Sequence, residues 1–375
     1  MTKREIMIAL LKHKEYKRTP FWLNGFTTKE MAEGYLGAEN VPDDFVFCSE
    51  YQKGAPTEEN QIKKIRYAEK SGSYAIAVGR NSNLAYGRGG PGVFLERIIE
   101  DQKDYYVTEC ETGIKTKYYK EPYSYGRSNY PLTTLDEIDD LKLPDPNEEE
   151  RYRGIEAEVD FLKKKGYFVY ANTNGILSGL YNYLYPFQDL MINLVENKAG
   201  VHKAINKVKE FNLTVARNFL ERGVDCIGFC DDLGFATSLF FSRNMFKEFF
   251  LPFYREVADL CHQYDGFVHM HSHGNLLKVM DLLEDINIDI LNPCLSEEQM
   301  DVEYLLNNYG QKMAFAGGIS SSKLKDLTDA EIEDEIKGLV AKLRDKPYIM
   351  MAGFSQEMPQ EKFDLIIDNI KKLSG

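Results

Sequence analysis

Residues 225–293 read DCIGFCDDLGFATSLFFSRNMFKEFFLPFYREVADLCHQYDGFVHMHSHGNLLKVMDLLEDINIDILNP. Three short apolar runs in this stretch, Asp225–Cys230, Phe267–His273 and Ile288–Asn292, have the length and composition of buried strands. Between them lie Ser242–Tyr264 and Asn275–Glu284, in which apolar residues recur with helical spacing. Short buried strands that alternate with helices are typical of parallel βαβ units, so this stretch predicts an α/β fold with a parallel sheet.

The same alternation extends over the rest of the chain. Five more apolar runs bring the number of predicted strands to eight, which predicts a (β/α)8 TIM barrel that forms a single domain over residues 1–375. The last predicted helix opens with Thr328-Asp-Ala-Glu331, a capping box. The five runs are Pro20–Gly25, Asp44–Ser49, Tyr167–Thr173, Lys312–Gly317 and Tyr348–Gly353, and the further helices are Ala199–Arg222, Asp301–Tyr309 and Thr328–Leu343.

Residues from about 70 to 125 interrupt the alternation. The segments GVFLERII, DYYVTEC and IKTKYYK alternate as antiparallel strands do, and Glu111-Thr-Gly113 fits the turn of a hairpin. We interpret the region as an antiparallel β insertion after the second barrel strand. From the sequence, it lies either over the barrel mouth or at an edge far from the site.

Composition excludes several functional classes. Lys plus Arg is 46 and Asp plus Glu is 59, so the net charge of 46 − 59 = −13 disfavours binding to nucleic acid or to an anionic membrane. No apolar run approaches the roughly 20 residues of a membrane span, and no signal-peptide core is present. The six cysteines form no C-x-x-C pair, which indicates free thiols. We therefore expect a cytoplasmic protein.

Three of the six histidines, His269, His271 and His273, fall within five residues at the end of a predicted strand. Alternate residues of a strand share one face, so their side chains would point the same way in steps of about 7 Å. The carboxyl ends of barrel strands carry the active sites of barrel enzymes, and imidazole binds zinc and transfers protons near neutral pH. The alternative is a set of hydrogen-bonded core histidines.

Other polar residues follow neighbouring predicted strands. Asp231 and Asp232 come directly after Asp225–Cys230; such a carboxylate is a candidate acid, base, substrate acceptor or metal ligand, or it caps the next helix. Cys294 is either a thiolate ligand of zinc or a small buried hydrophobic residue. Asn172, Thr173 and Asn174 end another strand, where they could orient a polar substrate or form a turn. Gly317–Ser320 could cradle an anion or simply pack tightly.

These segments resemble the uroporphyrinogen decarboxylase superfamily. The resemblance is carried by D-D-x-G after a strand, the S-x-x-x-F-x-x-F-x-x-P-x-Y helix and the H-x-[CH]-G-N turn, all within residues 225–293. It continues through MDVEYLLNNYGQKMAFAGGIS and is visible in KREIMIALLKHKEYKRTPFW, so it covers nearly the whole chain. The resemblance implies a (β/α)8 barrel and suggests a homodimer.

The superfamily contains two chemistries. True uroporphyrinogen decarboxylases work without a cofactor and bind substrate carboxylates through an R-Q-A-G-R-Y motif, whose place here is taken by Phe21-Trp-Leu-Asn-Gly-Phe26, without arginine. The other branch transfers methyl groups between a corrinoid protein and a thiol or another acceptor, and holds zinc through H-x-C and a distant Cys. His271 and His273 match the H-x-C pair, and no Cys falls at Gly353-Phe-Ser355, where the distant one is expected.

We therefore predict a methyltransferase-like enzyme that acts on a small methylated substrate, with a corrinoid protein as its partner. The alternatives are a metal-free decarboxylase and an inactive barrel that binds a small ligand. An acid is needed where an oxygen leaves, and Asp231, His271 or Glu357 would supply the proton. Predicted catalytic residues are Asp231, His271 and His273; predicted zinc ligands are His271, His273 and Cys294; and predicted substrate-binding residues are Asn24, Asn172, Asn174, Asp232 and His269.

Overall fold

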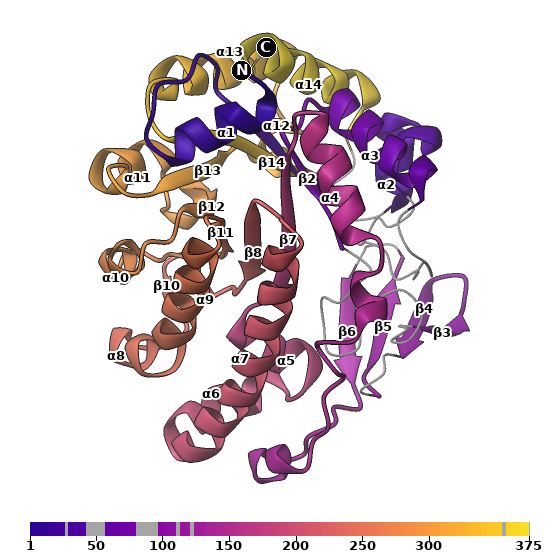
Figure 1. The fold of residues 1–375 in the computed structure, drawn as a ribbon, viewed down its shortest axis with the longest axis vertical. Coiled ribbons are helices and arrows are strands. Elements are labelled where there is room, and N and C mark those ends of the chain that lie inside the picture. Colours follow the sequence, from indigo (N-terminus) through magenta and orange to yellow (C-terminus); the bar gives the residue numbers. More distant parts are fainter. Residues whose placement is uncertain are drawn as a thin grey trace.

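The computed structural model describes residues 1–26, 29–42, 57–79, 97–109, 113–120, 124–354 and 358–374. Within these residues, eight parallel strands form a nearly closed barrel with helices between them, which confirms the predicted TIM barrel (Figure 1). Its strands are β1 (Phe21–Phe26), β2 (Ala75–Ala77), β7 (Phe168–Asn174), β8 (Cys226–Cys230), β11 (Phe267–His271), β12 (Ile290–Cys294), β13 (Ala314–Gly318) and β14 (Tyr348–Phe354).

The strands pair in the order β1-β14-β13-β12-β11-β8-β7-β2. The backbone N–H of Tyr74, just before β2, donates to the carbonyl of Phe21 in β1 at 2.7 Å, and so links the two ends of the sheet. The sequence predicted the second strand at Asp44–Ser49, which lies outside the described residues. Among the described residues, β2 takes the second place in the barrel, and its three residues, Ala-Ile-Ala, are too short to stand out as an apolar run.

Helices cover the outside of the barrel, and the predicted ones are present with changed bounds. The segment Ser242–Tyr264 forms α8, a π-helical turn η4 and α9 in succession, and the capping box of Thr328 and Glu331 forms as predicted at α13. Asn275–Glu284 is helical only from Met280 onward.

The helices are α1 (Lys3–Leu11), α2 (Lys29–Leu36), α3 (Glu58–Ser71), α4 (Ile155–Lys164), α5 (Ile176–Tyr183), α6 (Phe187–Glu196), α7 (Lys198–Glu221), α8 (Arg243–Met245), η4 (Phe246–Phe250), α9 (Leu251–Gln263), α10 (Met280–Asp285), α11 (Val302–Tyr309), α12 (Ser321–Leu324), α13 (Asp329–Leu343) and α14 (Gln360–Ser374). Short 3₁₀ turns are η1 (Ala38–Asn40), η2 (Leu135–Asp139), η3 (Glu149–Tyr152) and η5 (Ser296–Glu298).

The amino end of the barrel is closed by α1. Its apolar side chains, including Met7 and Leu10, pack with Trp22, Phe168 and Phe267 in a buried cluster inside the barrel. Arg4 ties the helix to the barrel through a 2.8 Å ion pair with Asp225, the residue before β8. Because this end is filled, access to the barrel interior is from the carboxyl ends of the strands. Among the described residues, no helix has the length and hydropathy needed to cross a membrane.

An antiparallel sheet follows the second barrel strand, as predicted. It comprises β3 (Arg97–Asp101), β4 (Tyr105–Glu109), β5 (Lys115–Tyr119) and a fourth strand, β6 (Ser124–Ser128), that the sequence did not indicate. Figure 1 shows this sheet set beside the barrel rather than within the ring of helices. Burial and the nearby Asp232 raise the pKa of Tyr181 on α5, and the nearby Tyr125 of β6 contributes in the same sense. Tyr125 of the insertion is therefore near Tyr181 on α5.

Candidate active site

Three potential metal ligands meet at the carboxyl ends of β8 and β11. The donor atoms of Cys230, Asp232 and His271 all lie within 4.8 Å of one another, and each side chain is partly buried. The Cys230 thiol donates to Oδ1 of Asp232 at 3.9 Å, and Nε2 of His271 lies 4.0 Å from the same oxygen. Two ligands of a tetrahedral zinc ion are roughly 3.5 Å apart given bonds of 2.0–2.3 Å. The three donors thus approach the spacing of a zinc site with an open fourth position.

The donor set also fits a cation electrostatically. Burial raises the pKa of the Cys230 thiol well above its usual range, and the adjacent Asp232 and Asp231 carboxylates add to that effect. Burial lowers the pKa of His271, which favours the neutral imidazole that a metal requires. Cys230 and Asp232 would bind a metal as anions, and His271 would bind it as a neutral imidazole. In a partly buried place these three ligands are suitable for Zn²⁺.

His273 turns away from this cluster. The strand β11 ends at His271, and Gly274, with φ of +99°, bends the chain so that it packs directly on the backbone of Gly234. Nδ1 of His273 lies 2.5 Å from Oε1 of Glu298, and hydrogen bonding to that carboxylate raises the pKa of His273. The prediction that three histidines share one strand face is therefore wrong for His273, although its ring still lies 5.0 Å from that of His271.

His269 points into the barrel one layer below His271. It is 5 % exposed, its ring packs 4.8 Å from Trp22, and Nε2 is hydrogen bonded to Oδ1 of Asn292. Burial lowers the pKa of His269 to about 3, so the ring is neutral. Asn292 also lies next to His271, whose pKa its hydrogen bond raises. The structure thus places His269 behind the site residues, where it supports Asn292 rather than facing a substrate.

Asp231 is fully buried and caps a helix. Its two oxygens accept from the backbone N–H groups of Ile176 at 2.7 Å and Ser178 at 2.6 Å, and Oδ2 also accepts from the Tyr254 hydroxyl at 2.8 Å. A side chain at Gly175 would collide with this carboxylate at 2.2 Å, so a glycine is needed there. Capping of the next helix was one of the roles predicted for this carboxylate; the helix that is capped is α5, which follows the neighbouring strand β7.

The metal set predicted from the sequence is not assembled. Cys294 is 1 % exposed and its thiol donates to the carbonyl of Leu291, while burial raises its pKa. Neither Cys294 nor His273 joins the described cluster of donors. Cys230 was missed, although its position two residues before Asp232 and the placement of both at a strand end were a usable signal. Glu357, the other proton donor considered, lies outside the described residues.

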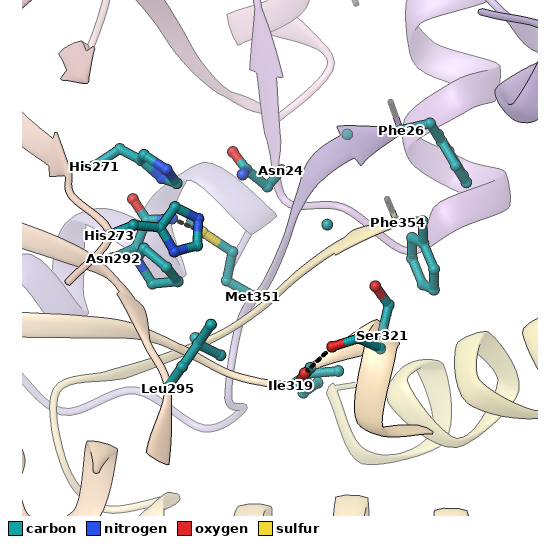
Figure 2. Close-up of a pocket in the computed structure, with 16 residues that line it drawn as sticks. Asn24, Phe26, His271, His273, Asn292, Leu295, Ile319, Ser321, Met351 and Phe354 are labelled. Atoms are coloured by element: carbon teal, nitrogen blue, oxygen red, sulfur yellow. Dashed lines mark hydrogen bonds between the residues drawn. The ribbon is translucent and has the colours of Figure 1, made fainter. Parts of the chain in front are cut away.

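A cavity of about 260 Å³ opens beside His271 and His273. Figure 2 shows His271, His273 and Asn292 gathered on one side of it, with Asn24 and Met351 close by and Ile319 and Ser321 farther along. Asn24, predicted to bind substrate, therefore lines the cavity. Asn172 and Asn174 are instead register partners of Gly228 and Cys230 on β8, which places Asn174 beside the donor cluster.

Comparisons with known proteins agree with the barrel. A family model described as uroporphyrinogen decarboxylase matches residues 110–373. The fold is similar to that of a methyltransferase from Methanosarcina mazei, with a TM-score of 0.69, 14 % identity and coverage of 100 % of both chains. A putative vitamin-B12 independent methionine synthase from Listeria monocytogenes also matches, with a TM-score of 0.44, 11 % identity and coverage of 96 % of this chain and 97 % of that one. No curated protein matched the sequence.

Proposed function

The chain belongs to the uroporphyrinogen decarboxylase family, and we propose that it is a metal-dependent methyltransferase of that family. It would take a methyl group from a heteroatom of a small substrate and pass it to a corrinoid protein or a thiol. The observation that carries the proposal is the meeting of Cys230, Asp232 and His271 beside a cavity at the carboxyl end of the barrel. The description of the Methanosarcina mazei protein as a methyltransferase is in keeping with it.

Cys230, Asp232 and His271 would hold a zinc ion. When bound, zinc supplies a Lewis acid that polarises a heteroatom of the substrate or acceptor. Asp232 also accepts from the backbone N–H of His273 at 2.9 Å, so its carboxylate fixes the turn that carries the second histidine. Asn292 packs beside His271 and lines the cavity, where it orients both the imidazole and the bound substrate.

His273 and Glu298 form the proton-donating pair of the proposal. His273 lines the cavity with its ring half exposed, while Glu298 holds Nδ1 and accepts from the N–H of Gly274 at 3.2 Å. When the methyl group leaves a heteroatom, that atom takes up a proton, and His273 is placed to deliver it. Asp231 is a positioning residue in this scheme, because its oxygens are occupied by α5 and Tyr254.

The alternative of porphyrinogen decarboxylation predicts basic side chains that converge on the pocket. Among the described residues that line the cavity there is no Lys or Arg. A substrate with several carboxylates would bury negative charge there without a partner, which is costly. This observation favours the methyltransferase over the decarboxylase.

A corrinoid protein would approach the open end of the barrel, where the cavity lies, and the chain itself would be a homodimer. Light scattering of the purified protein tests the second point: a mass near 43.2 kDa, that of one chain, would contradict it.

The function is tested by metal content and methyl transfer together. Zinc is added to the purified protein, unbound metal is removed, and the bound metal is measured by mass spectrometry. The protein is then mixed with reduced cobalamin and a panel of methyl ethers, methylamines and methyl thioethers, and methylcobalamin is followed by absorbance. We expect about one zinc per chain and methyl transfer that is lost in His271→Ala. Protein that binds no zinc, or that releases CO₂ from a carboxylated substrate without metal, would contradict the proposal.

A further inference from the structure

The cavity beside His271 carries little charge. Among the described residues that line it, only His271 and His273 can ionise, and His273 is already paired with Glu298. The remaining lining consists of amides, hydroxyls, backbone and apolar side chains. Burying a carboxylate in such surroundings has a large desolvation penalty, whereas that of a neutral molecule is much smaller. Excess positive charge would not offset it, because Cys230 and Asp232 would balance the proposed zinc ion and Glu298 balances His273.

Hydrogen-bonding groups occupy two separate parts of the cavity. One part holds Asn24 and Asn292 with the two histidines, and the other holds the hydroxyls of Ser320 and Ser322, which lie 2.9 Å apart. Leu295, Ile319 and Met351 line the cavity as well, and Figure 2 shows Met351 on the histidine side and Ile319 beside Ser321. The arrangement suits a molecule with a polar group at each end and an apolar body.

Gly353 creates the space for that body. On β14 it alternates with Ile349 and Met351, which belong to the cluster inside the barrel, so its missing side chain leaves room in the interior. A Cβ added to Gly353 would lie 3.7 Å from the side chain of Asn24, an ordinary contact, so Ala is accommodated without strain. Larger side chains at this position would project into the cavity.

We propose that the site selects uncharged substrates whose apolar body lies against Gly353 and whose distal end carries a hydroxyl or carbonyl that hydrogen bonds to Ser320 and Ser322. The placement of the methylated end beside His271 and His273 rests on the proposed function. The selection against anions and the role of Gly353 rest on the lining of the cavity. Gly353 is therefore a specificity-determining residue, and the two serines recognise the end of the substrate that does not react.

The test compares three probes that share a methoxyphenyl group: 4-methoxybenzyl alcohol, 4-methoxybenzoate and methoxybenzene. Binding to the full chain is measured by calorimetry without any methyl acceptor. We expect the alcohol to bind at least tenfold more tightly than the benzoate. The double variant Ser320→Ala/Ser322→Ala should weaken the alcohol several-fold and leave methoxybenzene unchanged.

Gly353→Val should weaken both neutral probes tenfold or more, and Gly353→Ala should weaken them less. Gly338→Val is the matched control, because a side chain at Gly338 on α13 meets nothing within 4 Å. Benzoate binding as tight as that of the alcohol, no binding of either neutral probe, or full binding by Gly353→Val would overturn the inference. The two proposals fail separately: selective binding without methyl transfer contradicts only the function, and methyl transfer from anionic substrates contradicts only the selectivity.

Discussion

His271 and Cys230 are register partners on the adjacent parallel strands β11 and β8, so their side chains emerge next to each other at the carboxyl end of the barrel. Asp232, two residues beyond Cys230, returns to the same place, with Oδ1 4.0 Å from Nε2 of His271. The strand register, rather than nearness in sequence, therefore builds the cluster. Substituting Cys230 and Cys294 in turn tests which of these two cysteines binds zinc.

Cys230→Ser should lower the zinc content of the protein from about one per chain to well below that value, because a hydroxyl replaces the thiolate ligand. Cys294→Ser is the matched control: Cys294 lies on the neighbouring strand β12, but its thiol donates to Leu291 and it is not part of the donor cluster. Metal analysis after zinc loading and gel filtration compares the two variants. Full zinc content in Cys230→Ser would contradict the assignment of Cys230, and loss of zinc in Cys294→Ser would restore Cys294 as a ligand.

Asp231→Asn should destabilise the fold without removing zinc. The amide keeps one acceptor, but its NH₂ group cannot accept from the second N–H of α5, so we expect the free energy of unfolding to fall by about 2 kcal/mol. Tyr254→Phe removes one of the same hydrogen bonds and should reduce stability by about 1 kcal/mol. Urea denaturation measures both. If Asp231→Asn lost zinc while its stability was unchanged, Asp231 would be a ligand rather than a cap.

His262 provides a pH dependence at the amino end of the barrel. The hydrogen bond from His262 to Asp289, with Nε2 and Oδ2 2.9 Å apart, raises the pKa of His262, and Asp259 adds to the effect. A raised pKa means that the pair stabilises the fold fully below about pH 6.5, the ordinary value for histidine, and less as pH rises through the folded-state pKa.

His262→Gln should therefore reduce the free energy of unfolding more at pH 5.5 than at pH 9. Because the side chain is 36 % exposed, the difference should stay within about 1 kcal/mol. Denaturation curves at the two pH values measure it. A larger loss at pH 9 would have the wrong sign and would refute the ion pair as the cause.

The barrel was predictable because its signal repeats. Strands such as Phe267–His271 and Tyr348–Phe354 are apolar runs of sufficient length, and each is followed by a segment with helical spacing. The strand β2 was not predicted because Ala75–Ala77 has only three residues, so its strand character comes from pairing with β7. Pairing between distant strands leaves little trace in the local sequence.

The location of the site was predictable from the sequence, but the full set of residues that form it was not. Asp232 and His271 were identified from their positions at strand ends, and Asn24 was predicted to bind substrate; all three lie at the cluster or the cavity. Cys230 needed the register of β8 against β11, which no local pattern contains. The capping of α5 by Asp231 likewise depends on the packing of two neighbouring βα units, as does the turn that sends His273 to Glu298.

Glu298→Gln should impair the proton-donating pair while the metal site stays intact. The amide cannot supply the negative charge that raises the pKa of His273 and favours its protonated form, so we expect kcat for methyl transfer to fall about tenfold or more, with little change in KM. Zinc content should be unchanged, because Glu298 is outside the donor cluster. Glu297→Gln is the matched control: it removes the same charge from the exposed neighbour on η5. A loss of activity equal to that of Glu298→Gln in this control, or a change in KM alone, would refute the role of Glu298 in proton transfer.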